Sequence, residues 1–143
     1  MAAAARPLPP VVGSTENALG ALLASLLAAT PLESTRHWVA LNVAASAGDA
    51  HAVSVALKAD LAATSVLLED LRAAGLVEQS AGTWHPTSSG TALLRDLRGR
   101  IAEVTDRLVR DLLPNDIETT IRVLEHLRRG AERELERRRQ QTA

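Results

Sequence analysis

The chain has 143 residues and a mass of 15.2 kDa, which is enough for one folded domain and too little for two. It contains no cysteine, which excludes disulfides, thiolate metal sites and a cysteine nucleophile, and its formal net charge of −1 gives no general attraction to nucleic acid or membranes. Phe and Tyr are also absent, so the core must be built mainly from Leu, Val, Ala and Ile, a composition typical of helical proteins.

The N-terminal residues are rich in Ala and Pro, and we expect residues 1–13 to form a disordered leader. They lack an apolar stretch followed by a cleavage site, so we expect no targeting signal and a cytoplasmic protein. From Ser14 to Thr30 leucines recur on one helical face, which predicts an amphipathic helix that ends before Pro31. This helix is too short to span a membrane, and we expect no membrane association.

Three helices are predicted in the next part of the chain. Ser34 is a good N-cap for a helix that continues to Ala47, and a short helix follows over residues 51–59. Asp60 is the N-cap of the third helix, because apolar side chains follow it at three- and four-residue spacing as far as Gly75. Each helix therefore has a face that can be buried.

A short hairpin is predicted directly after Gly75. The Ser-Ala-Gly sequence at residues 80–82 supplies turn residues between two short extended segments, and Pro86 is expected to end their pairing. We expect Trp84, on the second strand, to pack against the helix beneath it.

Two long helices are predicted in the C-terminal part. The first runs from Thr87 to Leu113 and carries a seam of apolar residues typical of supercoiled helices, with Leu97 and Leu108 among them. Pro114 interrupts the chain, and the last helix becomes almost wholly charged beyond Gly130. Its arginines alternate with glutamates at ion-pair spacing, which is typical of a solvated helix face.

This order of elements resembles the MarR family of winged helix-turn-helix regulators. The motif L-x-x-x-GLV closes the third helix at residues 71–77, and T-x-x-G opens the next long helix at residues 87–90. The resemblance implies a mainly α fold (α+β with one small β-hairpin wing), in which a winged helix-turn-helix head is joined to long N- and C-terminal dimerisation helices. The expected organisation is a leader over residues 1–13 and a single MarR-like domain over residues 14–143, with dimerisation helices at 14–30 and 88–140 and the winged helix-turn-helix at 34–87.

The resemblance implies that the helix over residues 60–75 reads DNA. The candidate DNA-binding residues are polar or cationic positions on the head or at the start of the following helix: Lys58, Ser65, Arg72, Thr83, His85, Arg95 and Arg98. The charge of the head disagrees with this role. Residues 49–87 hold two cationic and five acidic side chains, so their formal charge is two minus five, or −3. The wing tip also lacks the arginine that relatives commonly insert into the minor groove.

The resemblance further implies a crevice for a small aromatic or phenolic ligand beside the helix that begins at Ser34. The candidate ligand-binding residues are Arg36, His37, Trp38 and His51. The alternative is structural, with Trp38 in the core and His37 half-exposed.

No motif for catalysis, a cofactor or a metal is present. The four histidines fall in different elements without a ligand pair at helical spacing, and neither a phosphate loop nor a Ser-His-Asp order is recognisable. We therefore expect no metal and no cofactor. An enzyme would need an active site assembled from residues of separate helices at a dimer interface.

The leading interpretation is a MarR-like homodimeric DNA-binding transcriptional regulator that responds to a small-molecule ligand. The acidic head motivates an alternative, a MarR-fold protein that has lost DNA binding and binds or transforms a small molecule, as a biosynthetic enzyme or ligand-binding protein. A third interpretation is a dimeric interaction module that docks on another protein through its apolar recognition helix. A dimer is expected in all three, since the long helices carry more apolar surface than one small head can cover.

Overall fold

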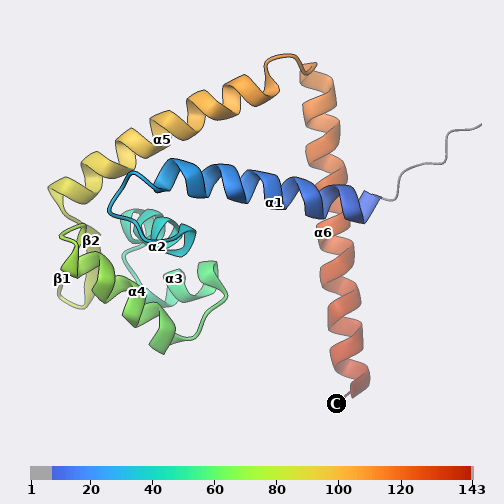
Figure 1. Ribbon diagram of the computed structural model, residues 1–143. Helices are drawn as coiled ribbons and strands as arrows, with labels where there is room; N and C mark the ends of the chain where they lie inside the picture. Colours follow the sequence, from blue (N-terminus) through green and yellow to red (C-terminus); the bar gives the residue numbers. More distant parts are fainter. Residues whose placement is uncertain (1–7, 143) are drawn as a thin grey trace, which may run out of the picture. The chain divides into compact units, whose positions relative to one another are not determined.

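The computed structural model of the protein describes residues 8–142, which form six helices and one two-stranded antiparallel sheet (Figure 1). The described chain divides into two units, of which the first ends at Glu103 and the second begins at Val104. The predicted fold class, mainly α with one small β-hairpin, is confirmed.

The first helix, α1 (Leu8–Leu27), begins six residues earlier than the sequence predicted. Residues 1–7 of the expected leader lie outside the described residues, whereas residues 8–13 form the first turns of α1. Pro9 and Pro10 are compatible with this start because they lie in the first turn, where backbone N–H groups have no acceptor within the helix. Near its other end, Leu27 is buried and Leu23 packs against the core.

Three shorter helices build the base of the head: α2 (Thr35–Ser46), α3 (Ala50–Leu57) and α4 (Leu61–Ala73). Each follows an N-cap whose side-chain oxygen accepts a hydrogen bond from a backbone N–H of the first turn. Ser34 caps α2, Asp49 caps α3 with a bond of 3.0 Å, and Asp60 caps α4 with a bond of 2.7 Å. These short polar residues therefore fix where the three helices begin.

The wing consists of β1 (Val77–Ser80) and β2 (Thr83–Pro86). Pairing extends one residue further than predicted, since Pro86 lies opposite Val77 in the last pair of the ladder. The wing is also joined to the α2–α3 turn, because the Trp84 N–H donates to the Gly48 carbonyl at 2.7 Å. Gly48 has a φ of +65°, and a Cβ at this position would lie 2.5 Å from a Thr83 methyl carbon, so a larger residue does not fit.

Two long helices complete the chain: α5 (Ser88–Val109) and α6 (Pro114–Thr142). The Thr87 hydroxyl accepts from the Gly90 N–H at 3.1 Å and donates to the Gly75 carbonyl at 2.6 Å, which ties the start of α5 to the end of α4. A Cβ at Gly90 would lie 2.0 Å from the Leu76 carbonyl oxygen, so this close approach requires glycine.

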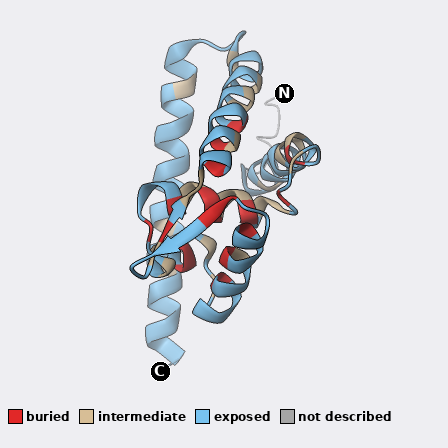
Figure 2. Ribbon diagram, turned by 90° about the vertical axis from the view of Figure 1, so that its left-hand side faces the viewer, coloured by how far each residue is buried: buried red, intermediate tan, exposed pale blue. Residues whose placement is uncertain are grey.

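The core lies in the first unit, where α2, α4, the wing and the N-terminal half of α5 bring their apolar side chains together (Figure 2). Leu41, Leu68 and Leu97 are fully buried there, and Trp84 is buried as expected. By contrast, no described residue of α6 is buried.

No single helix among residues 8–142 has both the length and the hydropathy to cross a membrane. Helices α3 and α4 taken together would meet both criteria by length and composition alone, but the chain bends by 109° between them.

Candidate functional site

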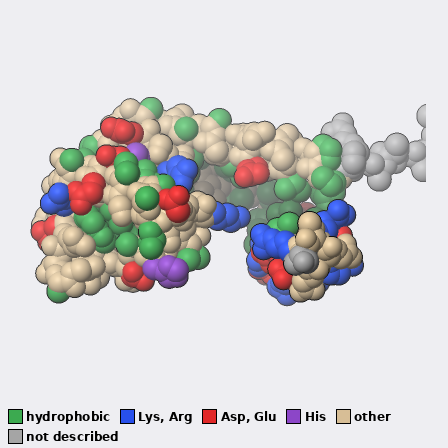
Figure 3. Space-filling model, turned by 90° about the horizontal axis from the view of Figure 1, so that it is seen from below, with side chains coloured by type: hydrophobic (Ala, Val, Ile, Leu, Met, Phe, Trp, Pro, Cys, Tyr) green, Lys and Arg blue, Asp and Glu red, His purple; other side chains and the backbone are tan. Residues whose placement is uncertain are grey.

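Helix α4 has one face in the core and one open to solvent, as a DNA-reading helix requires. Thr64, Leu68 and Leu71 are buried, whereas Ser65 and Val66 are exposed. Apolar side chains predominate on the exposed surface of α3 and α4, where Val55, Leu61 and Val66 are more than half exposed. Seen from below, the head carries hydrophobic patches with few Lys and Arg side chains among them (Figure 3).

The two cations of residues 49–87, Lys58 and Arg72, differ in their surroundings. Arg72 forms an ion pair with Glu69, whose carboxylate lies 2.6 Å from the guanidinium Nη2 and 2.8 Å from Nε. Lys58 occupies the C-cap of α3 with a left-handed φ of 49°, and its side chain is exposed at the α3–α4 turn. Among the described residues Lys58 forms no ion pair, so it is the cation of the helix-turn-helix that remains available for a phosphate.

The remaining candidate DNA contacts lie on the wing and on α5. Thr83 is half-buried and His85 is exposed on the wing. Arg95 is exposed, but Arg98 donates from Nε and Nη2 to the Asn42 side-chain oxygen at 3.1 and 2.9 Å. Arg98 therefore joins α5 to α2 in the free protein.

Most of the acidic side chains of the head have structural roles. Asp49 and Asp60 are N-caps, where the partial positive charge of a helix N-terminus offsets a carboxylate. Glu69 pairs with Arg72, and Asp70 lies beside His37. Most of the carboxylates that give residues 49–87 their formal charge of −3 therefore stabilise the head itself.

The candidate ligand-binding residues do not form one cluster through hydrogen bonds. His37 is buried, which differs from the half-exposed position in the structural alternative, and it faces α4. Trp38 is half-buried against the core, and its backbone carbonyl accepts from the Asn42 amide at 2.9 Å. Arg36 and His51 are both exposed. Within residues 8–142, neither the Arg36 guanidinium nor the His51 imidazole forms a hydrogen bond with another candidate residue. Their role in ligand binding stays a prediction.

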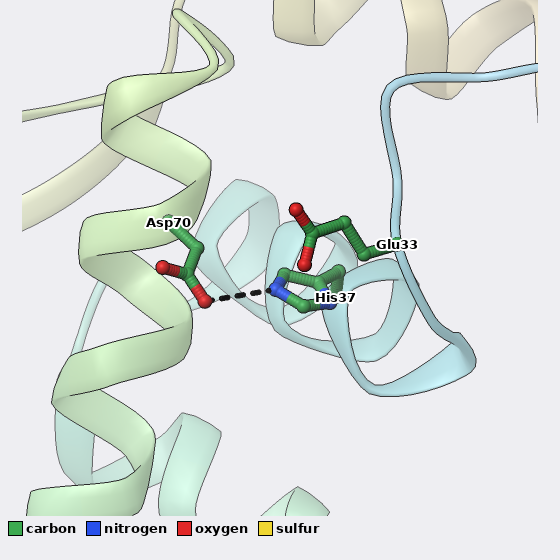
Figure 4. A group of neighbouring side chains, drawn as sticks. All are labelled: Glu33, His37 and Asp70. Carbon is green, nitrogen blue, oxygen red and sulfur yellow. Dashed lines mark hydrogen bonds and ion pairs between the residues drawn. The ribbon is translucent and has the colours of Figure 1, made fainter.

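A side-chain cluster that the sequence did not reveal surrounds His37 (Figure 4). Glu33, His37 and Asp70 each offer one metal-ligand atom, and these atoms all lie within 4.8 Å of one another. Glu33 and His37 are four residues apart, a spacing that is visible in the sequence. Asp70 joins them only through the packing of α4 against α2, so no local pattern predicts the complete cluster.

Several solved structures with a similar fold are MarR family proteins. No protein-family model matches the sequence, and no curated protein is similar to it in sequence. Among solved structures, a MarR family protein from Bacillus stearothermophilus has a TM-score of 0.74 at 14% identity, covering 87% of this chain and 93% of that chain.

Two further relatives were solved with ligands. A MarR family protein of Mycobacterium tuberculosis in complex with salicylic acid has a TM-score of 0.64 at 19% identity, covering 85% of this chain and 98% of that chain. CouR from Rhodococcus jostii, bound to p-coumaroyl-CoA, has a TM-score of 0.71 at 16% identity, covering 89% and 95%. The resemblance noted in the sequence is confirmed at the level of structure, and the chain therefore has the fold of the MarR family of transcriptional regulators.

Proposed function

We propose that this protein is a cytoplasmic, homodimeric MarR-like transcriptional regulator that binds DNA through α4 and the wing and responds to a small aromatic ligand. The observation that carries the proposal is the similarity to MarR regulators over most of the chain, including an α4 that is exposed on the face opposite the core. In this arrangement each α4 of the dimer enters a major groove, and the dimer matches a pseudo-palindromic site.

A dimer is supported by the apolar surface of the second unit. Helix α6 has no buried residue, yet Ile121, Leu124 and Leu127 recur along it and are 52%, 41% and 43% exposed. A long helix is not stabilised in water by such a stripe alone, because most helix stability in proteins comes from packing of an apolar face. A second copy of the chain supplies that packing in a two-fold dimer.

DNA binding is expected to be specific but only moderately dependent on salt. If Lys58 and Arg95 are the phosphate contacts of each protomer, the dimer makes four such contacts, and the log–log slope of affinity against salt is about −4. Lys58→Ala is expected to make this slope shallower by about two, one contact for each protomer. Fluorescence anisotropy with the upstream region of its own gene and with random duplex, at about 50 mM and about 200 mM salt, measures both effects.

The matched control is the double replacement Glu125→Gln/Arg129→Gln, which removes an exposed ion pair of α6 without changing the net charge. It is expected to leave the slope unchanged. A wild-type protein that binds neither duplex at either salt concentration would refute the DNA-binding proposal.

Helix α2 supplies two groups that suit an aromatic acid. The Arg36 guanidinium is exposed and matches a carboxylate, and Trp38, two residues further along α2, is half-buried and offers an aromatic surface. Two MarR relatives carry ligands with aromatic groups, salicylic acid and p-coumaroyl-CoA. These observations support a small aromatic acid as the ligand class.

Isothermal titration calorimetry with salicylate is expected to show saturable binding that Arg36→Gln weakens about tenfold or more, because a charge-assisted hydrogen bond contributes about 1.5–3 kcal/mol. The matched control is Arg139→Gln in the last turn of α6, which is expected to bind salicylate like the wild type. Equal affinity in wild type and Arg36→Gln would contradict this placement of the ligand.

The acidic head favours a second candidate function, in which a MarR-fold protein no longer binds DNA and instead binds or transforms a small molecule. Its supporting observations are the formal charge of −3 over residues 49–87 and the pairing of Arg72 with Glu69. Salicylate binding together with complete absence of DNA binding would favour this candidate over the regulator.

A further inference from the structure

We propose that Glu33, His37 and Asp70 form a binding site for a divalent transition metal ion, with Zn²⁺ as the best match. We call it the α2–α4 metal site. Its three ligand atoms lie within 4.8 Å of one another, and His37 Nε2 is 3.3 Å from an Asp70 carboxylate oxygen. Two ligands bound to one tetrahedral Zn²⁺ by bonds of about 2.0–2.1 Å lie about 3.3 Å apart, so the His37–Asp70 separation already fits. Figure 4 shows both carboxylates beside the imidazole, one from α4 and the other from the segment before α2.

The imidazole of His37 is held in the orientation that a ligand requires. Its side chain is 9% exposed, and Nδ1 lies 2.8 Å from the Ser34 hydroxyl oxygen. When Nδ1–H donates to Ser34, Nε2 carries the lone pair and points it at Asp70. Metal-binding histidines in proteins are typically fixed in this way, by a hydrogen bond from the nitrogen that does not bind the ion. Without an ion, the 3.3 Å contact is a hydrogen bond in which Nε2–H donates to the Asp70 carboxylate, so the ion takes the place of that proton.

The charge of the cluster also favours a cation. Neither Glu33 nor Asp70 forms an ion pair with Lys or Arg within residues 8–142, and His37 is the one side chain there that contacts the Asp70 carboxylate. With a neutral imidazole the cluster therefore carries a formal charge of −2. The side chain of Asp70 is 48% exposed and Glu33 is exposed, so an ion can enter from solvent and keep a water ligand.

The ligand types select the class of metal. One imidazole nitrogen and two carboxylate oxygens suit a borderline ion such as Zn²⁺ better than Ca²⁺ or Mg²⁺, which prefer oxygen alone. The chain has no cysteine, so the softer thiolate sites that bind Cu⁺ are excluded. Among divalent ions the general order of affinity places Zn²⁺ above Mn²⁺ and Fe²⁺ at such a site.

Metal binding would act on the helix that we propose to read DNA. The ion links the start of α2 to Asp70 in α4, and its two positive charges change the formal charge of residues 33–87, where Glu33 and Arg36 cancel, from −3 to −1. A less acidic head approaches phosphates more easily, so we expect Zn²⁺ to strengthen DNA binding. This regulatory effect rests on the proposed function, whereas the metal site itself does not.

The site is tested on the full-length, untagged, chelator-treated protein by titrating Zn²⁺ against a chromogenic chelator in the absence of DNA. The expected result is one Zn²⁺ per protomer, with affinity lowered at least about tenfold in Glu33→Gln and in Asp70→Asn. Both variants alter exposed side chains, and their circular dichroism is expected to match that of the wild type. Visible absorption of bound Co²⁺ provides a second readout, which both variants are expected to lose.

Two control variants distinguish this site from nonspecific binding of Zn²⁺ elsewhere on the protein. Glu69→Gln changes the carboxylate next to Asp70 in the same helix, and His126→Gln removes a histidine of α6; both are expected to bind Zn²⁺ like the wild type. Wild-type affinity in Glu33→Gln and Asp70→Asn would overturn the metal site, whether or not the protein binds DNA. If Zn²⁺ binds but leaves the DNA affinity of the wild type unchanged, the regulatory effect is overturned.

Discussion

A Leu97→Asp variant is expected to lose the folded head. Leu97 is fully buried in the core of the first unit, where α5 packs on the head. An aspartate there has no cationic partner among its buried apolar neighbours, and an uncompensated buried charge costs about 3–5 kcal/mol or more. Since a domain of this kind is stable by only about 5–15 kcal/mol, the substitution removes a large part of its stability. Far-UV circular dichroism and the urea midpoint measure the loss.

Leu97→Met is the matched control, because it keeps the position apolar and nearly conserves volume. Its expected cost is below about 1.5 kcal/mol, which lowers the urea midpoint slightly and leaves the helical signal intact. A Leu97→Asp protein with the wild-type midpoint would show that α5 is not part of this core.

The beginnings of α2 and α4 were predictable because they depend on neighbouring residues. Ser34 and Asp60 accept hydrogen bonds from N–H groups only three residues ahead, so the sequence already contains both donor and acceptor. The burial of Trp84 was predictable for a similar reason, since a two-stranded wing can cover a large ring only by placing it on the helices beneath.

The features that were not predictable depend on contacts between distant residues. The hydrogen bonds from Arg98 to Asn42 join residues 56 positions apart, and the approach of Asp70 to His37 joins residues 33 positions apart. No spacing rule connects such pairs, so the sequence predicts neither the contact of Arg98 with Asn42 nor the α2–α4 metal site. The early start of α1 is hard to predict for another reason, because Pro9 and Pro10 fit both a disordered segment and the first turn of a helix.

The apolar seam of α5 shows most clearly what the sequence leaves open. Leu97 and Leu108 belong to the same periodic stripe, and the sequence assigns both to the dimer interface. The structure separates them, because Leu97 is fully buried in the first unit whereas Leu108, in the second, is 53% exposed. Hydrophobic periodicity identifies the face of a helix but not the partner that covers it.

Leu108→Asp is therefore expected to dissociate the proposed dimer while leaving the head folded. In a two-fold interface the substitution occurs twice, and loss of two buried leucine side chains costs about 3–6 kcal/mol, or roughly 10²- to 10⁴-fold in the dimer dissociation constant. Sedimentation velocity over a range of protein concentrations measures this change, and circular dichroism checks that the helical content of the head persists.

Arg107→Asp is the matched control, since it places the same carboxylate one residue away at a position that is already charged and exposed. It is expected to sediment as a dimer, because Leu108 and the leucines of α6 remain intact. A Leu108→Asp protein that stays dimeric would place the interface on other residues, and a wild-type protein that is monomeric at all concentrations would refute the dimer itself. In that case the exposed stripe of Ile121, Leu124 and Leu127 would need a different partner chain to cover it.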